Sequence, residues 1–179
     1  MRLFIGGSMH DDISKKYIED CDKYLDDLFS RDNDLVFGAR NSGIMGLAYE
    51  KALKYGRKII GACPEMFKSD LDGLNCDEEI LTQSIIERTE KLIEESDALI
   101  FLPGGIGSMH EFFTMIEGRR SGEFSKPIII YNSCGYFDKL LNFFDEMYKQ
   151  GFITKLDLRS FHVSSDFKDT LEYMNNYND

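Results

Sequence analysis

The sequence predicts an α/β protein with a Rossmann-like, doubly wound parallel sheet and helices on both faces. Short apolar runs alternate along the chain with longer segments whose apolar residues recur at helical spacing. The short runs are apolar throughout, which is typical of strands that helices cover on both faces. Several runs end at glycine-rich turns, where such sheets bind ligands. We find no internal repeat and no linker, so we expect one domain over residues 1–179.

The first half of the chain predicts three strands and two helices. Each of the first two strands runs into glycine, and the segment after it is amphipathic at helical spacing. In order, we expect a strand at 3–5, a helix at about 12–29, a strand at 35–37, a helix at 44–55 and a strand at 58–62.

The second half continues the same alternation. The strand at 98–102 ends at Pro103, and an amphipathic run with Phe112 and Ile116 follows it. In order, we expect a helix at 78–95, a strand at 98–102, a helix opening near residue 108, a strand at 127–131, a helix at 137–149, a strand at 161–163 and a helix at 167–174.

The composition excludes several classes of protein. The chain has 32 acidic and 21 basic residues, a formal charge of -11, which repels nucleic acid but allows one phosphate at a helix start. Its four cysteines form no C-x-x-C pair, which indicates reduced thiols and no metal site. No apolar run is long enough to span a membrane and no signal peptide is evident, so we expect a cytoplasmic protein.

Three glycine clusters follow predicted strands, at residues 6–8, 38–46 and 103–108. If these strands are neighbours, the clusters meet in one crevice at the carboxyl ends of the strands. The third cluster opens a helix and exposes backbone N–H groups that suit a phosphate. It lacks the Gly-Lys-Ser/Thr of a P-loop, and His110 stands where a dinucleotide fingerprint has its third glycine. A nucleoside monophosphate therefore fits better than ATP or NAD.

Residues 103–111 (PGGIGSMHE) resemble the PGGxGTxxE signature of the LOG (Lonely Guy) family, long labelled as lysine decarboxylases. Residues 4–8 are similar to the family's opening strand, and residues 37–46 (FGARNSGIMG) resemble its YGGGxxGLMG stretch. The family's second signature, M-H-x-R-K, keeps only its arginine here: Arg88 stands 15 residues before Pro103 (103 − 88). The resemblance implies hydrolysis of a nucleoside 5′-monophosphate, of the AMP or cytokinin ribotide type, to a free base and ribose 5-phosphate.

The chemistry that this implies needs a carboxylate and a cation. Cleavage of an N-glycosidic bond passes through an oxocarbenium-like sugar. A carboxylate stabilises the positive charge of this sugar, and it can also orient or deprotonate the attacking water. Glu111 is the candidate carboxylate, and Arg88 is the candidate cation that neutralises ligand charge or keeps Glu111 ionised. Alternatively, Ser108 and Glu111 form only a capping box, as we expect for Ser84 and Glu87.

The resemblance also implies the rest of the site. The expected reaction needs no cofactor and no metal, and the expected ligand is a small nucleotide. The resemblance further implies that the protein is a homodimer. Arg40 replaces a family glycine; it either reaches into the crevice or lies on the surface, and we expect the surface. The predicted substrate- and phosphate-binding residues are Gly104, Gly105, Ile106, Gly107, Ser108, Gly7, Ser8, Gly43, Met45 and Gly46.

Two other functions stay open. The reduced M-H-x-R-K segment favours a nucleotide-binding protein of the same fold without activity. The third alternative is a broader nucleoside-monophosphate nucleosidase or a deoxyribosyltransferase. Release of free base, and its dependence on Glu111 and Arg88, distinguishes these possibilities.

Overall fold

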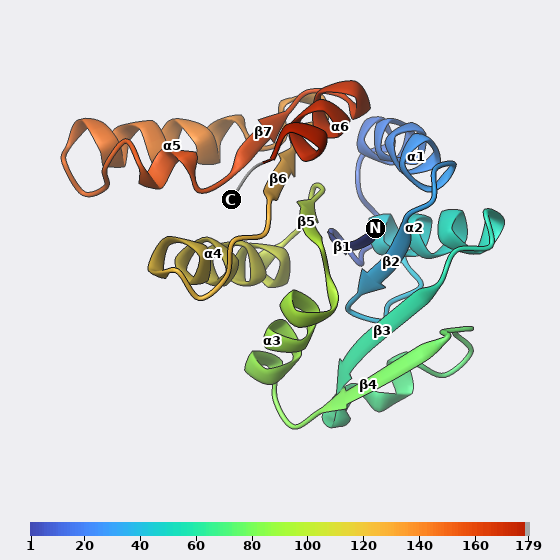
Figure 1. Ribbon diagram of the computed structural model, residues 1–179. Helices are drawn as coiled ribbons and strands as arrows, with labels where there is room; N and C mark the ends of the chain where they lie inside the picture. Colours follow the sequence, from blue (N-terminus) through green and yellow to red (C-terminus); the bar gives the residue numbers. More distant parts are fainter. Residues whose placement is uncertain (178–179) are drawn as a thin grey trace.

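A seven-stranded parallel sheet forms the centre of the molecule (Figure 1). The computed structural model describes residues 1–177. The strand order is β4-β3-β2-β1-β5-β6-β7, and every neighbouring pair is parallel. The strands are β1 (Arg2–Gly6), β2 (Asp34–Phe37), β3 (Ile59–Pro64), β4 (Glu78–Thr82), β5 (Ala98–Phe101), β6 (Ile128–Tyr131) and β7 (His162–Ser164).

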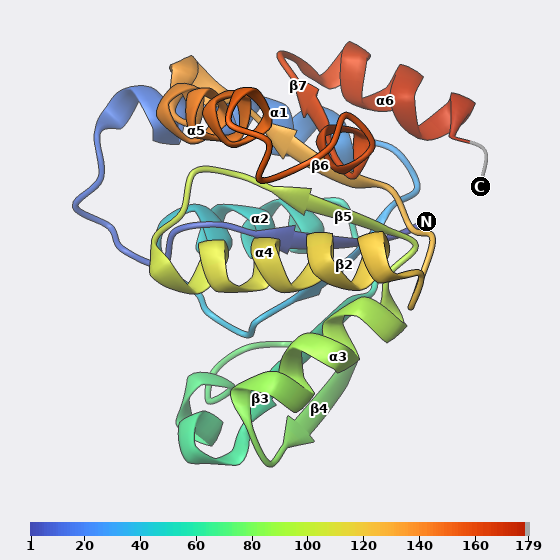
Figure 2. The ribbon, with the colours of Figure 1, turned by 90° about the vertical axis from the view of Figure 1, so that its left-hand side faces the viewer.

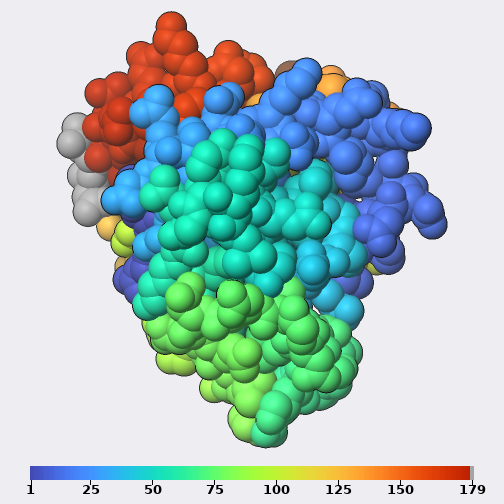
Figure 3. Space-filling model, turned by 90° about the vertical axis from the view of Figure 1, so that its right-hand side faces the viewer, coloured from blue at the N-terminus to red at the C-terminus, as the bar shows by residue number. Residues whose placement is uncertain are grey.

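Helices cover both faces of this sheet, which confirms the predicted fold class. One face carries α1 (Lys15–Phe29), α2 (Gly43–Lys54) and α6 (Phe167–Asn176), which lie side by side in the space-filling view (Figure 3). The other face carries α3 (Ile85–Glu95), α4 (Ile106–Ser121) and α5 (Asp138–Lys149), with α3 and α4 in the foreground of Figure 2. Three short 3₁₀ helices, η1 (Glu65–Asp70), η2 (Ser133–Gly135) and η3 (Asp157–Arg159), lie in the connections.

The alternation of side chains along β1 explains why its sequence is apolar throughout. Leu3 and Ile5 point into the core under α1 and α2, whereas Phe4 points into the core under α3, α4 and α5. All three side chains are buried because the strand has helices on both faces. The same two-sided burial holds for β5.

The sheet reverses its winding direction between β1 and β5. The chain runs outward from β1 through β2 and β3 to β4, then returns to pair β5 with β1. At such a switch point the two adjacent loops diverge and leave a crevice beyond the carboxyl ends of the strands. The glycine clusters follow β1, β2 and β5, which are neighbours, so the condition set from the sequence is met.

The predicted helix at 78–95 is wrong over its first third. Glu78–Thr82 forms β4, an edge strand that pairs only with β3, and α3 begins at Ile85. Exposed Glu78 and Glu79 face solvent there, so their preference for helices does not decide the structure. The expected cap is confirmed, because the Ser84 hydroxyl oxygen accepts a hydrogen bond from the Glu87 N–H at 3.1 Å.

Other differences from the prediction are small. Helix α1 begins three residues later than expected, and most remaining boundaries agree within one or two residues. The four cysteines are free. Within residues 1–177, no helix combines the length and the hydropathy needed to cross a membrane.

Candidate functional site

A pocket of about 860 Å³ lies at the carboxyl edge of the sheet. Its walls come from the turns after β1, β2 and β3 and from the N-terminal parts of α3 and α4. These are the strand ends around the switch point, where the topology places a ligand. The glycine clusters therefore converge on one pocket, to which α3 contributes as well.

The first turn of α4 forms one end of this pocket. Gly105 occupies the N-cap position, so no side chain caps the helix, and the first intrahelical bond joins the Met109 N–H to the Gly105 carbonyl. The N–H groups of Ile106, Gly107 and Ser108 therefore have no acceptor within the helix. All of these residues line the pocket. Together with the helix dipole, the free amides make this end suitable for an anion such as a phosphate.

Gly104 packs against the first turn of α4 and determines the shape of the turn that precedes it. A Cβ atom on Gly104 would lie 2.1 Å from the Ser108 Oγ, so only glycine fits there. The Ser108 hydroxyl donates to the Gly7 carbonyl at 3.1 Å, and the Tyr136 hydroxyl donates to the Gly104 carbonyl at 2.7 Å. A further bond, from the Ser8 N–H to the Pro103 carbonyl, joins the turns after β1 and β5 at 2.9 Å. These contacts fix the position of the free amides.

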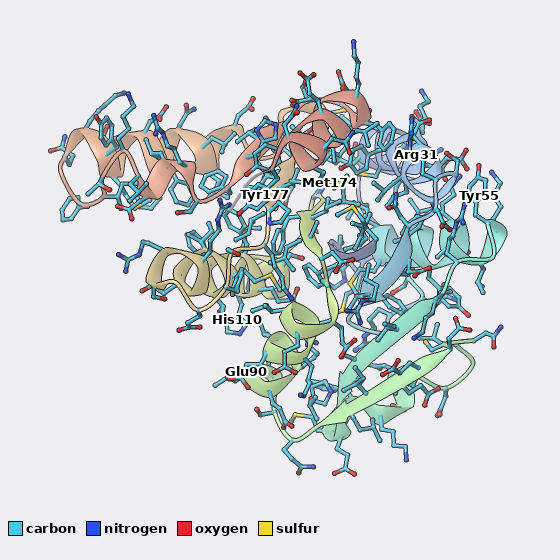
Figure 4. The ribbon with its side chains drawn as sticks, viewed as in Figure 1. Arg31, Tyr55, Glu90, His110, Met174 and Tyr177 are labelled. Atoms are coloured by element: carbon cyan, nitrogen blue, oxygen red, sulfur yellow. The ribbon has the colours of Figure 1, made fainter. Side chains whose placement is uncertain are left out.

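An arginine–carboxylate pair lines the pocket between α3 and α4. Arg88 on α3 donates from Nη2 to Oε1 of Glu111 on α4 at 2.6 Å. Their side chains are only 17% and 10% exposed. Figure 4 labels a residue close to each member of the pair: Glu90 on α3, near Arg88, and His110 on α4, next to Glu111. The capping-box alternative for Glu111 is wrong, because α4 begins two residues before Ser108 and the Glu111 carboxylate is bound by Arg88.

Burial and charge act on Glu111 in opposite directions. Burial raises the pKa of the Glu111 carboxyl, while the charge and hydrogen bond of Arg88 lower it; burial has the larger effect, and the pKa lies above its usual value. Arg88 retains unused donors: its buried Nε has no hydrogen-bond partner among the described residues. The pair thus combines a carboxyl that titrates above its usual range with a cation able to bind further acceptors.

A second charged pair, Arg40 with Asp70, lies at the end of the pocket next to β3. Arg40 Nη2 is 2.8 Å from Asp70 Oδ2. The expectation that Arg40 lies on the surface is wrong: its side chain is partly exposed but lines the pocket, as Phe67 and Cys63 do. The buried Ala39 before it has φ +55°, a left-handed conformation in which the family glycine would be unstrained.

The structure divides the other predicted residues into two groups. Gly7, Ser8 and Met45 line the pocket together with the α4 residues. Gly43 and Gly46 do not line it: the Gly43 N–H binds the Asp11 carboxylate at 2.8 Å, and a Cβ on Gly46 would lie 3.0 Å from the Asn41 carbonyl carbon. Gly104 also lies outside the lining, because it packs behind the first turn of α4.

Several lining residues were not predicted from the sequence. Cys63 and Pro64 directly follow the predicted third strand, so their position at a strand end was a usable signal. Phe67 and Asp70 belong to the short helix η1, for which the sequence carries no periodic signal. The remaining lining residues that were not predicted for the site are Met9, His10, Ile85, Ile86 and His110.

Comparisons with known proteins show the family of this chain. The family model described as "Possible lysine decarboxylase" matches residues 45–174. The chain is 36% identical over 140 residues to the probable cytokinin riboside 5′-monophosphate phosphoribohydrolase LOGL1 of Oryza sativa subsp. japonica, covering 78% of this chain and 62% of that protein. It is 33% identical over 129 residues to the cytokinin riboside 5′-monophosphate phosphoribohydrolase LOG1 of Arabidopsis thaliana, covering 72% and 61%. The chain thus spans about three fifths of the length of these relatives.

Solved structures share the fold at lower identity. The Moco carrier protein from Chlamydomonas reinhardtii superposes with a TM-score of 0.69 at 19% identity, covering 97% of this chain and 94% of that one. The molybdenum cofactor binding protein from Rippkaea orientalis gives a TM-score of 0.71 at 17% identity, with coverage of 97% and 94%. At these identities the likeness establishes the fold alone.

Proposed function

The chain belongs to the LOG family, and on that premise we propose that it hydrolyses the N-glycosidic bond of a nucleoside 5′-monophosphate. The products are a free base and ribose 5-phosphate. The substrate is of the AMP or cytokinin ribotide type, and the whole chain acts as one nucleotide-binding domain. The names of the curated relatives support an enzyme of this class.

One observation carries the proposal: the Arg88–Glu111 pair and the uncapped start of α4 face the same pocket. Glu111 stands five residues after Ile106 (111 − 106), which is about 7.5 Å along the helix axis. A ribose 5-phosphate with its phosphate on the α4 amides spans that interval. Its anomeric carbon then lies near the carboxylate, while the two negative groups stay apart.

In this arrangement the Glu111 carboxylate stabilises the positive charge that develops on the ribose as the C1′–N bond weakens. It also orients a water molecule, whose oxygen forms the new bond to C1′. The electron pair of the broken bond leaves with the base, which takes up a proton. Arg88 lowers the pKa of Glu111 against the effect of burial and so increases the ionised fraction.

The test is base release from AMP and from N6-isopentenyladenosine 5′-monophosphate. We expect release by the native chain and a loss of at least a hundredfold in kcat for Glu111→Gln. Glu90→Gln is the matched control, because Glu90 is an exposed carboxylate on α3. Full activity in Glu111→Gln contradicts the assignment of Glu111.

A second candidate is a nucleotide-binding protein without hydrolytic activity. The segment around Arg88 reads Ile85-Ile86-Glu87-Arg88-Thr89, so the Met, His and Lys of the family signature are absent. Ile85 and Ile86 line the pocket in this segment. Tight binding of a monophosphate without release of any base supports this candidate over the hydrolase.

We also propose a cytoplasmic homodimer. The aromatic residues of α4 and α5 differ in burial: Phe112 and Phe144 are buried, whereas Phe113 and Phe143 are exposed. Exposed aromatic side chains on adjacent helices support a contact with a second copy. Sedimentation of the native chain and of Phe143→Ser tests this, and a monomeric native chain contradicts it.

A further inference from the structure

The Arg40–Asp70 pair lies at the opposite end of the pocket from the α4 amides. Along the edge of the sheet, the strand order places β1 and β5 at one end of the pocket and β3 at the other, with β2 between. The α4 amides follow β5, Arg40 follows β2, and Asp70 ends the η1 helix after β3. A ligand held by its phosphate at α4 therefore extends toward Arg40 and Asp70.

Charged groups of both ion pairs act on the Cys63 thiol at the end of β3. Burial raises the pKa of the Cys63 thiol, Asp70 raises it further, and Arg88 and Arg40 lower it. The Cys63 thiol itself donates to the Phe67 carbonyl at 3.0 Å. Arg40, Arg88 and Cys63 all line the same pocket.

The pair offers donors and acceptors that its own ion pair does not use. Arg40 has five N–H donors, and the contact with Asp70 is through Nη2. Asp70 contacts Arg40 through Oδ2, which leaves the acceptor sites of Oδ1 for a further donor. The result is a donor and an acceptor side by side in a pocket that Phe67 also lines.

The backbone supports a role for this position. Ala39 is one of only two non-glycine residues with positive φ within residues 1–177, and it directly precedes Arg40. A left-handed conformation is costly for a residue with a Cβ atom and occurs most often where function requires a particular geometry. Here the left-handed conformation of Ala39 positions Arg40 so that its side chain lines the pocket.

We propose that Arg40 and Asp70 bind the edge of an unmodified base that presents an acceptor beside an amino group, as adenine does. Arg40 donates to the ring nitrogen and Asp70 accepts from the exocyclic amine. An isoprenoid chain on that amine takes the place of one of its two N–H donors and sets an apolar group against the ion pair, so the pair selects against prenylated nucleotides. This inference rests on the proposed function for the position of the phosphate.

Binding to a chain that cannot turn over tests the proposal directly. Calorimetry on Glu111→Gln measures the dissociation constants of AMP, N6-isopentenyladenosine 5′-monophosphate and ribose 5-phosphate. We expect AMP to bind about tenfold more tightly than the prenylated nucleotide. Adding Arg40→Gly, which restores the family residue, should weaken AMP about tenfold and abolish the preference. Ribose 5-phosphate has no base, so its affinity should not change.

Two results overturn the proposal: an unchanged preference in Arg40→Gly, or an equal loss of affinity for ribose 5-phosphate. The second result would place Arg40 at the phosphate. Asp70→Asn is a second variant that keeps the size of the side chain, and it should also weaken AMP selectively. Failure of the proposed function gives a different result from failure of this inference. In that case the native chain releases no base, although the binding pattern described here still holds.

Discussion

Replacing Arg88 with methionine should raise the pKa of Glu111. The guanidinium is the one cation bound to this buried carboxylate in the part of the chain that the structure describes, with Nη2 and Oε1 2.6 Å apart. Methionine keeps most of the side-chain length but removes the charge and the hydrogen bond. Burial of Glu111 then acts unopposed on the protonation equilibrium.

The size of the effect follows from the geometry. With an effective dielectric constant of about 20, unit charges about 4 Å apart attract each other by about 4 kcal/mol. Since one pH unit corresponds to about 1.4 kcal/mol, this is an upper limit of about 3 pH units. Both side chains keep some exposure, 17% and 10%, which weakens the attraction. We therefore expect the pKa of Glu111 to rise by about 1 to 3 pH units.

Carbon-13 NMR of side-chain carboxyl groups measures this pKa without reference to activity, and Glu111→Gln identifies the signal. If the ionised form is the active one, activity is lost as the pH falls through the pKa. The acid limb of kcat/KM should therefore lie at higher pH in Arg88→Met than in the native chain. Arg88→Lys keeps the charge and should show a smaller rise. An unchanged or lower pKa in Arg88→Met would refute the electrostatic coupling.

The remaining predictions concern the phosphate end of the pocket and the chemistry. Gly104→Ala places a Cβ 2.1 Å from the Ser108 Oγ, so it should destabilise the fold by about 1 to 3 kcal/mol in chemical denaturation and weaken ribose 5-phosphate. Gly107→Ala is its control, because a Cβ there meets nothing within 4 Å and stability should not fall. Tyr136→Phe removes the 2.7 Å bond to the Gly104 carbonyl and should cost about 0.5 to 1.5 kcal/mol by the same measurement; no loss would show that this bond does not hold the turn. Exhaustive dialysis against EDTA should leave base release unchanged, and restoration by an added divalent cation would contradict a reaction without metal.

The sequence was sufficient for six of the seven strands because these strands differ in pattern from the helices. Buried strands such as Ile128–Tyr131 are apolar on both faces, and amphipathic helices such as Lys15–Phe29 have a single apolar face. Edge strand Glu78–Thr82 has neither pattern, since its first residues are exposed and charged. Its pairing with β3 is a tertiary contact, which local propensity does not contain.

The candidate site was predictable where backbone chemistry determines it. The glycines of residues 103–108 indicated a helix start with free amides, and the structure has such a start at Ile106. The Arg88–Glu111 contact joins residues 23 apart, and the spacing known from the family pointed to it. Asp70 gave no such signal, because a carboxylate in a short 3₁₀ helix reaches the pocket only through the path of the chain after β3.

A crystal structure of Glu111→Gln with AMP bound would test the proposed site most directly. We predict the phosphate within hydrogen-bond distance of the N–H groups of residues 106–108. We also predict the anomeric carbon beside residue 111 and the base toward Arg40. A phosphate bound elsewhere, with the amides of α4 covered by protein atoms or residue 111 turned out of the pocket, would contradict the proposed site.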